Sequence, residues 1–219
     1  QWGIHIDYAI QEKPEGIAQA ILIAESFING KDSILILGDN LFFGNNLNTL
    51  FNKASSRTSG ATIFAHQVKD PQRYGVPKID KNGAIISIEE KPKIAPSNYA
   101  ITGIYFFDKN VISYAKTISK SSRGEFEISD VNNIYINSKK MNLEKLGRGN
   151  TWFDVGTFQT LLEASEFVSS IENRQGLKIS CPEEIAYRLK KIDRNKLLEL
   201  INKMPNNQYR NYLLSISRE

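Results

Sequence analysis

The first part of the chain shows two kinds of apolar periodicity. Residues 4–10 alternate apolar and polar side chains, which predicts a strand. Residues 17–28 repeat apolar side chains at helical spacing and predict a helix that ends at Asn29-Gly30. Residues 33–37 form a short continuous apolar run, which is typical of a strand buried on both faces. We therefore expect this run to be a central parallel strand.

The remaining elements follow from the same rules. Lys81-Asn82-Gly83 separates two strand-like stretches, residues 76–80 and 85–89, and predicts a β-hairpin. Further strands are expected at residues 61–68, 99–107, 143–146 and 152–155, and helices at 47–54, 111–119, 128–137 and 157–171. Residues 181–217 hold two or three more helical segments. This order predicts an α/β fold, with a domain over residues 1–175 and a helical C-terminal region over 176–219.

Composition and charge exclude several classes of protein. The chain has 219 residues, of which 41% are hydrophobic and 24% charged, as in an ordinary globular protein. It has no membrane-spanning run and no recognisable secretion leader, so we expect no membrane partner. The net charge of +4 is not gathered into a basic stripe, which argues against a nucleic-acid partner. The single Cys181 cannot form an internal disulfide, which favours a reducing, cytoplasmic compartment.

Two aspartates follow predicted strands. Asp39 ends the run Leu37-Gly38-Asp39, and Asp154 ends the short strand at Trp152-Phe153. Ligands of open α/β sheets bind beyond the carboxyl ends of the strands, so the two carboxylates could hold one magnesium ion together with phosphate oxygens and water. Each aspartate alone is more often a turn former or a helix cap than a metal ligand.

Two further segments carry candidate binding groups. Glu89-Glu90-Lys91 ends a predicted strand, where the lysine offers a cation for a phosphate and the glutamates offer acceptors for sugar hydroxyls. The segment from Gln11 through Pro14 to Gly16 combines an amide with a helix start that could present polar groups to a planar base. A charged loop and an ordinary strand-to-helix turn are the alternative interpretations.

Taken together and in this order, these segments resemble the bacterial glucose-1-phosphate thymidylyltransferase family. The resemblance is carried by Leu37-Gly38-Asp39-Asn40, by Glu89-Glu90-Lys91-Pro92 and by Trp152-Phe153-Asp154. It is also carried by residues 11–20, 70–76, 98–105, 123–130, 147–149 and 174–186. The joint match extends from residue 1 to about residue 207 and is much more specific than any one segment.

The resemblance implies both a fold and a reaction. The fold is a Rossmann-like nucleotidyltransferase mixed sheet flanked by helices, with a small hairpin insertion. The reaction is the magnesium-dependent formation of dTDP-glucose and diphosphate from dTTP and glucose 1-phosphate, a step toward dTDP-rhamnose and lipopolysaccharide O-antigen, commonly in a homotetramer.

The resemblance also implies residue roles. Asp39 and Asp154 would hold the metal, and with Lys91, which would clamp the sugar phosphate, they form the expected catalytic set. Gln11, Pro14 and Gly16, together with Asp39, would bind the nucleotide. The expected sugar-phosphate pocket consists of Tyr74, Gly75, Glu90, Lys91, Ile101, Gly103 and Tyr105.

One part of the family pattern is not found between Gln1 and Glu219. It comprises the first strands of the sheet and a glycine-rich loop, Gly-Gly-x-Gly-Thr-Arg-Leu-x-Pro, which wraps the triphosphate. We therefore expect the fold to lack its N-terminal strands. A transferase that uses UTP or another sugar phosphate, and a non-catalytic nucleotide-sugar-binding subunit, remain the alternatives.

Overall fold

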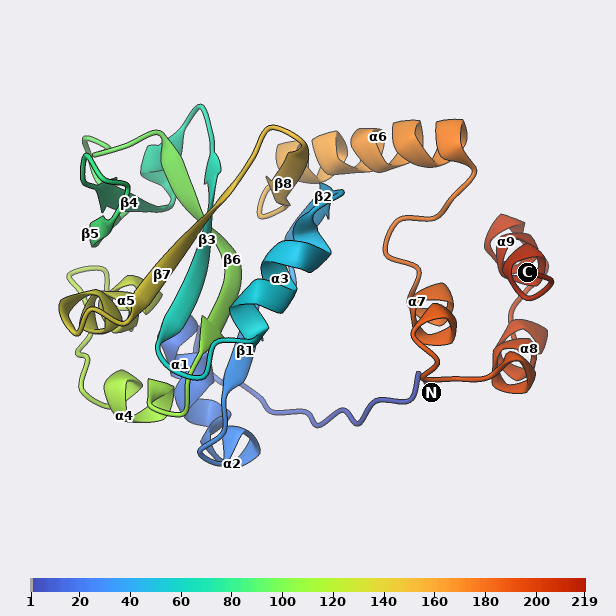
Figure 1. The fold of residues 1–219 in the computed structure, drawn as a ribbon, viewed down its shortest axis with the longest axis horizontal. Helices are drawn as coiled ribbons and strands as arrows, with labels where there is room; N and C mark the ends of the chain where they lie inside the picture. The colour runs from blue at the N-terminus through green and yellow to red at the C-terminus, as the bar shows by residue number, and fades with distance from the viewer. Residues whose placement is uncertain (1) are drawn as a thin grey trace. The chain divides into compact units, whose positions relative to one another are not determined.

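The computed structural model describes residues 2–219 and divides the chain into two compact units. One unit consists of residues 9–160, and the other of residues 2–8 together with 161–219. Helix α6 (Phe158–Gln175) runs across the division. The boundary predicted at residues 175/176 stays a prediction. The mixed α/β architecture expected for the chain is confirmed (Figure 1).

The centre of the larger unit is a four-stranded mixed sheet. Its strands are β1 (Ser33–Ile36), β3 (Ala61–Gln67), β6 (Tyr99–Phe107) and β7 (Met141–Leu146), in the order β1-β6-β3-β7. Strand β6 runs antiparallel to both β1 and β3, whereas β3 and β7 are parallel. Almost all of β6 is buried, because helices cover both faces of the sheet.

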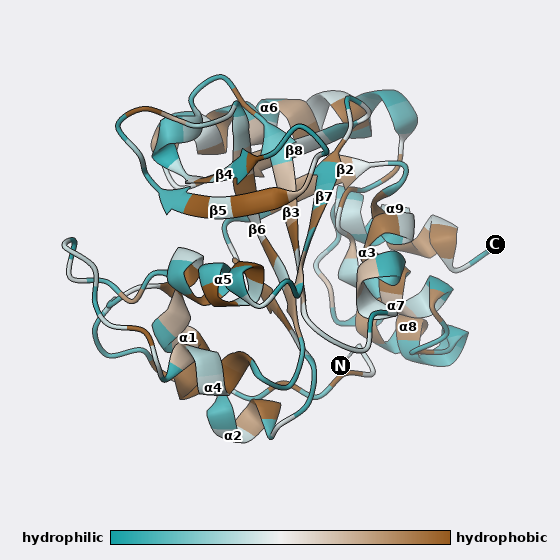
Figure 2. Cartoon of the chain, turned by 60° about the vertical axis from the view of Figure 1, so that its left-hand side comes forward, coloured by the Kyte–Doolittle hydropathy of each residue, from teal (hydrophilic) through white to brown (hydrophobic). Residues whose placement is uncertain are grey.

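Two apolar clusters hold the sheet between its helices. Strand residues such as Ile63 and Tyr105 pack with α1 (Ile17–Ile23), α4 (Val111–Ala115) and α5 (Ile128–Asn137) on one face. Phe64 and Phe106 point the opposite way and pack with α3 (Leu47–Ser55). The two faces therefore follow from the alternation of side chains along each strand, and the apolar stretches are coloured brown in Figure 2.

Two small two-stranded sheets complete the larger unit. Strands β4 (Gly75–Ile79) and β5 (Ile85–Glu90) form the predicted hairpin, and β2 (Asn40–Gly44) pairs antiparallel with β8 (Asn150–Asp154). The helical segments α2 (Glu25–Ile28) and η1 (Pro71–Arg73) lie in the connections. The β2–β8 pair is what brings the chain around Asp39 close to Asp154.

Two expectations about strands are wrong. Residues 4–10 form no strand, and Ile4, Tyr8 and Ile10 are exposed, because a strand requires a hydrogen-bonded neighbour. Strand β1 is an edge strand paired antiparallel with β6, and not a central parallel strand. Its side chains alternate between partly buried and exposed, with Ile34 52% and Ile36 60% exposed.

The smaller unit is helical, as expected for the end of the chain. It contains α7 (Pro182–Arg188), α8 (Arg194–Asn202) and α9 (Gln208–Ile216), and both α8 and α9 begin at a residue whose side chain caps the first turn. Its core includes the buried Cys181, Leu197 and Leu213. No helix among residues 2–219 is both long enough and apolar enough to cross a membrane.

Candidate active site

A pocket of about 250 Å³ in the larger unit gathers most of the predicted site residues. Both aspartates and every residue expected to bind the sugar phosphate line it, namely Asp39, Tyr74, Gly75, Glu90, Lys91, Ile101, Gly103, Tyr105 and Asp154. Segments far apart in the sequence supply them: the turn after β1, the residues of and next to the β4–β5 hairpin, the middle of β6 and the end of β8. We call it the sugar-phosphate pocket.

The two aspartates meet because β2 and β8 pair. Asn40 lies opposite Asp154 in the register, and the amide of Val155 donates to the carbonyl of Asp39 over 2.9 Å. Burial, and next the charge of Asp39, raise the pKa of the Asp154 carboxyl above its ordinary value. The cations of Arg73 and Lys91 act in the opposite direction. These four residues, Asp39, Arg73, Lys91 and Asp154, are referred to below as the charged rim.

A divalent cation would fit the charged rim. Two carboxylates that repel each other across one pocket are stabilised when a cation sits between them, and magnesium favours one or two carboxylates completed by phosphate oxygens and water. Among residues 2–219, no set of three or more His, Cys, Asp or Glu side chains forms a metal-binding group. Asp39 and Asp154 are two carboxylates of the charged rim that could hold magnesium together with phosphate oxygens and water.

Asn40, for which the sequence predicted no role, links Asp39 to β6 and to β8. Its Nδ2 donates to Oδ1 of Asp39 over 2.8 Å, while its own Oδ1 accepts from the amide of Gly103 at 3.0 Å and from Nε1 of Trp152 at 2.6 Å. A Cβ on Gly103 would lie only 2.6 Å from Oδ1 of Asn40, so this approach requires glycine. The position of Asn40 directly after Asp39 was the sequence signal that could have identified it.

Lys91 adopts an unusual backbone conformation. Its φ of 42° lies in the left-handed region, and its amide donates to the carbonyl of Tyr74 over 3.0 Å. Residues other than glycine reach this region at a cost in free energy, and such strain gathers at binding sites. Lys91 lines the pocket, so this conformation lies at the candidate site.

Three further lining residues are referred to below as the buried wall: Ser129 and Asn132 are buried, and Glu90 is partly buried. The Ser129 hydroxyl donates to Oε2 of Glu90 over 2.5 Å. Burial raises the pKa of the Glu90 carboxyl, and the hydrogen bond from Ser129 acts in the opposite direction. Gly75 lies against this pair, since a Cβ there would be 3.1 Å from Oγ of Ser129 and 3.2 Å from Oε2 of Glu90.

Ser129 and Asn132 were not expected in the site, although α5 was expected as a helix. The buried stripe of α5 includes Ile128, Val131 and Tyr135, and the two polar side chains lie within the same stripe. Polar residues at apolar positions of an amphipathic helix were the signal that could have found them.

Asp39 lines this pocket, whereas the other residues expected to bind the nucleotide do not. Gln11, Pro14 and Gly16 do not line it, although Ile17 of α1 does. The Gln11 side chain donates to the carbonyl of Gly16 over 3.2 Å, and Gly16 has a φ of 104°. A Cβ on Gly16 would overlap the carbonyl of Phe126, so a backbone contact accounts for the glycine. The nucleotide-binding role of these residues stays a prediction.

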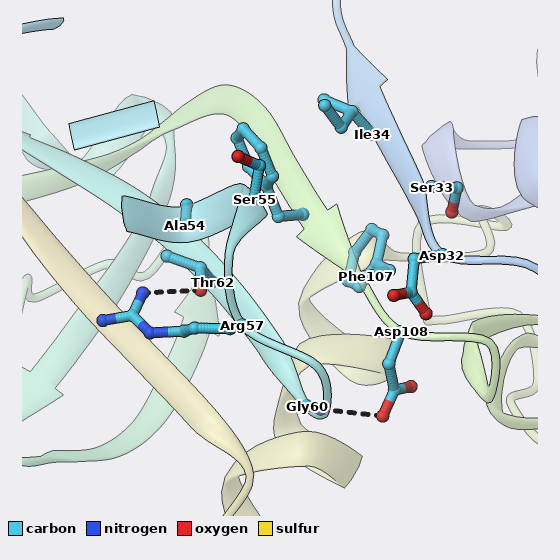
Figure 3. Close-up of a pocket in the computed structure, with 11 residues that line it drawn as sticks. Asp32, Ser33, Ile34, Ala54, Ser55, Arg57, Gly60, Thr62, Phe107 and Asp108 are labelled. Carbon is cyan, nitrogen blue, oxygen red and sulfur yellow. Dashed lines mark hydrogen bonds between the residues drawn. The ribbon is translucent and has the colours of Figure 1, made fainter. Parts of the chain in front are cut away.

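A second pocket, of about 210 Å³, lies toward the other end of β1 (Figure 3). Its polar side chains already have partners within the protein. Arg57 donates to Thr62 and to Glu144, and Asp108 accepts from the amide of Gly60 and from the Tyr135 hydroxyl. These bonds account for the residues without a ligand, so the sugar-phosphate pocket remains the candidate site.

The fold and this site define a class of protein. The family model for nucleotidyl transferases matches residues 1–171, and the chain belongs to this nucleotidyl transferase family. The chain is 46% identical over 218 residues to a glucose-1-phosphate thymidylyltransferase of Xanthomonas campestris, with 100% of this chain and 74% of that protein covered. Relatives of that description from Neisseria meningitidis and Mycobacterium tuberculosis are each 44% identical, over 100% and 98% of this chain and 76% and 74% of their own length. Within the family, the chain belongs to the glucose-1-phosphate thymidylyltransferases.

Solved structures share the fold. A Bacillus anthracis protein described as a glucose-1-phosphate thymidylyltransferase in complex with sucrose gives a TM-score of 0.66 at 38% identity. That comparison covers 74% of this chain and 64% of the other. A UDP-glucose pyrophosphorylase in complex with UDP-glucose gives a TM-score of 0.65 at 22% identity, over 75% of this chain and 66% of the other, which supports the fold alone.

Proposed function

We propose that the chain carries the sugar-phosphate side of an active site that joins dTTP and glucose 1-phosphate into dTDP-glucose and diphosphate. One observation carries this proposal: the charged rim and the buried wall line the same pocket. Cations and carboxylates on one side suit a phosphate with its metal, and buried hydrogen-bonding groups on the other suit the hydroxyls of a sugar.

The charged rim accounts for the phosphate chemistry. Asp39 and Asp154 would hold magnesium, which when bound supplies positive charge that neutralises the reacting phosphates. Lys91 would bind the phosphate of the sugar as a point charge. The transfer needs positioning and charge neutralisation more than a dedicated base, because a phosphate oxygen is already a nucleophile at neutral pH.

The reaction balances without a redox partner. An oxygen of the sugar phosphate forms a bond to the α-phosphorus of the nucleotide, the bond from that phosphorus to the diphosphate breaks, and diphosphate leaves with the electron pair. Here Lys91 holds the attacking phosphate, while Glu90 and the buried wall fix the sugar. The chain's residues thus act by orienting one reactant toward the other.

The finer parts of the assignment rest on the family relationship. They are the preference for dTTP over UTP, a homotetramer, a cytoplasmic location and a place in nucleotide-sugar synthesis toward dTDP-rhamnose. The chain aligns to about three quarters of its curated relatives' length. We therefore propose this activity for the protein as a whole, and not for the aligned residues alone.

The decisive experiment measures diphosphate release with glucose 1-phosphate and magnesium, in parallel reactions with dTTP and UTP. We expect a clearly higher kcat/KM with dTTP. Equal or faster turnover with UTP would reject the thymidylyl assignment, and no release with either nucleotide would favour a non-catalytic nucleotide-sugar-binding subunit.

A further inference from the structure

Helix α5 carries a polar side chain whose hydrogen-bonding atoms are all buried and all without a partner. Asn132 is 0% exposed, and neither its Oδ1 nor its Nδ2 has a hydrogen-bond partner among residues 2–219. It lines the sugar-phosphate pocket. In the same part of the chain, the only other residue with such an atom is Asn150, whose Nδ2 still donates to the carbonyl of Gly147.

Asn133, the next residue on α5, has partners within the protein for both its carboxamide oxygen and its carboxamide nitrogen. Asn133 donates from Nδ2 to the carbonyl of Ile88 over 2.9 Å and accepts from the amide of Ile88 at the same distance. Buried polar groups are nearly always paired, and an unpaired one needs an explanation. The pocket supplies one, because Asn132 faces it together with Ser129, which lies one helical turn earlier.

We infer that the Asn132 carboxamide determines sugar specificity by forming a hydrogen bond with one hydroxyl of the bound sugar. The inference rests on the proposed function and deepens it. A hydroxyl both donates and accepts, so it can pair with the carboxamide and with the Glu90 carboxylate at once.

The charges around the pocket set the direction in which the substrate lies. At the wall, Glu90 is negative, and its Oε1 is paired with Nη1 of Arg123 over 3.7 Å. At the charged rim, Lys91 and Arg73 attract a phosphate, and a cation between the two rim aspartates would offset the repulsion from their carboxylates. The phosphate therefore binds at the rim, and a hydroxyl reaches Asn132 at the wall. A sugar that lacks this hydroxyl leaves the carboxamide unpaired, which makes Asn132 a means of rejecting deoxy sugars.

The test compares glucose 1-phosphate with its 2-, 3-, 4- and 6-deoxy analogues by equilibrium binding. For the wild type we expect one analogue to bind about 10- to 100-fold more weakly than glucose 1-phosphate. Asn132→Leu, which keeps the volume and removes the polar atoms, should weaken glucose 1-phosphate more than this analogue and so reduce the difference between the two. Asn132→Ala gives a second measurement should the leucine variant not fold.

The matched control is Asn133→Ala. It removes an asparagine from the same helix but breaks only the bonds to Ile88, so we expect a lower melting temperature and an unchanged order of preference among the five ligands. The inference is overturned if the Asn132 variants keep the wild-type preferences or weaken all five ligands equally. If the wild type binds no glucose 1-phosphate at all, the proposed function itself fails, which is a different result.

Discussion

The charged rim and the buried wall of the pocket are built on different principles. The rim groups, Asp39, Arg73, Lys91 and Asp154, stand at the ends of strands or in turns and remain partly or largely exposed. The wall groups come from β5 and α5, and the Glu90 side chain is only 22% exposed. The rim is thus suited to ions, whose field reaches through water, and the wall to neutral groups that must touch. The predictions below test this difference.

The largest effect is expected at the rim aspartates. Asp39→Asn or Asp154→Asn removes a negative charge from the candidate magnesium site, and should lower the magnesium-dependent kcat by about 10²–10³-fold or more. Diphosphate release over a magnesium titration measures this. Asp32→Asn, in the second pocket, is the control and should keep the wild-type rate. Near-normal turnover in both rim variants would show that neither aspartate holds the metal.

Two variants of Lys91 distinguish the effect of its charge from the effect of its backbone strain. Lys91→Ala and Lys91→Gly should both weaken binding of glucose 1-phosphate by about 10- to 100-fold, because each removes the cation. Only the glycine variant also relaxes the positive φ, so it should be more stable to unfolding than the alanine variant, by about 1 kcal/mol. Calorimetric titration and chemical denaturation measure the two effects.

Lys139 provides the comparison for Lys91. It has a φ of 56° and does not line the pocket, so Lys139→Gly should relax strain without changing affinity. If the Lys91 variants bind glucose 1-phosphate as tightly as the wild type does, the phosphate lies elsewhere.

Gly103→Ala tests the support beneath the rim. The new Cβ would meet the Asn40 side chain, which must move and loosen its bonds to Asp39 and Trp152. We expect a loss of about 1–3 kcal/mol in unfolding free energy. Gly147→Ala, where a Cβ meets nothing within 4 Å, should leave stability nearly unchanged. Equal stability of the two variants would mean that Asn40 has room to adjust.

The smallest effect concerns the wall and depends on pH. Burial raises the pKa of Glu90 above its value in the unfolded chain. At a pH between these two pKa values, the unfolded state has lost a proton that the folded state still holds. Folding stability contributed by this group therefore falls as pH rises through that range. Glu90→Gln has no proton to lose, so its melting temperature relative to wild type should rise between pH 4 and pH 7.

The same substitution should weaken binding of glucose 1-phosphate by about 10-fold, because a neutral amide replaces the carboxylate that accepts from a hydroxyl. Glu89→Gln, on the exposed neighbour, serves as the control for both measurements. If the difference in melting temperature between Glu90→Gln and the wild type does not change with pH, ionisation of the Glu90 carboxyl does not reduce stability.

Local patterns in the sequence predicted the elements well, and long-range pairing less well. The hairpin, β6 and α5 were recoverable because turn residues and apolar spacing act over a few positions. The position of β1 at an edge depends on β6, which lies far along the chain, so a continuous apolar run could not reveal it. The strand expected at residues 4–10 failed for the same reason.

The site followed a similar division. Residues within recognisable segments, such as Asp39 and Lys91, were found, since their motif marks them directly. Ser129 and Asn132 line the pocket because α5 packs beside β5, and Arg73 lines it because η1 packs against β4 and β6. No spacing within one segment could indicate that packing, and the polar residues in the buried stripe of α5 were the one available clue.

The two hydrogen bonds between Asn133 and Ile88 help to fix the register of the hairpin. A two-stranded hairpin alone can slip, and a slip of one residue exchanges the two faces of a strand. In β5 such a slip would replace Glu90 by the adjacent Glu89, so the doublet would still present a carboxylate, but from the wrong position. By bonding both the amide and the carbonyl of Ile88, Asn133 adds a tie to α5 to the strand pairing of the hairpin, in which Glu90, and not Glu89, lines the pocket.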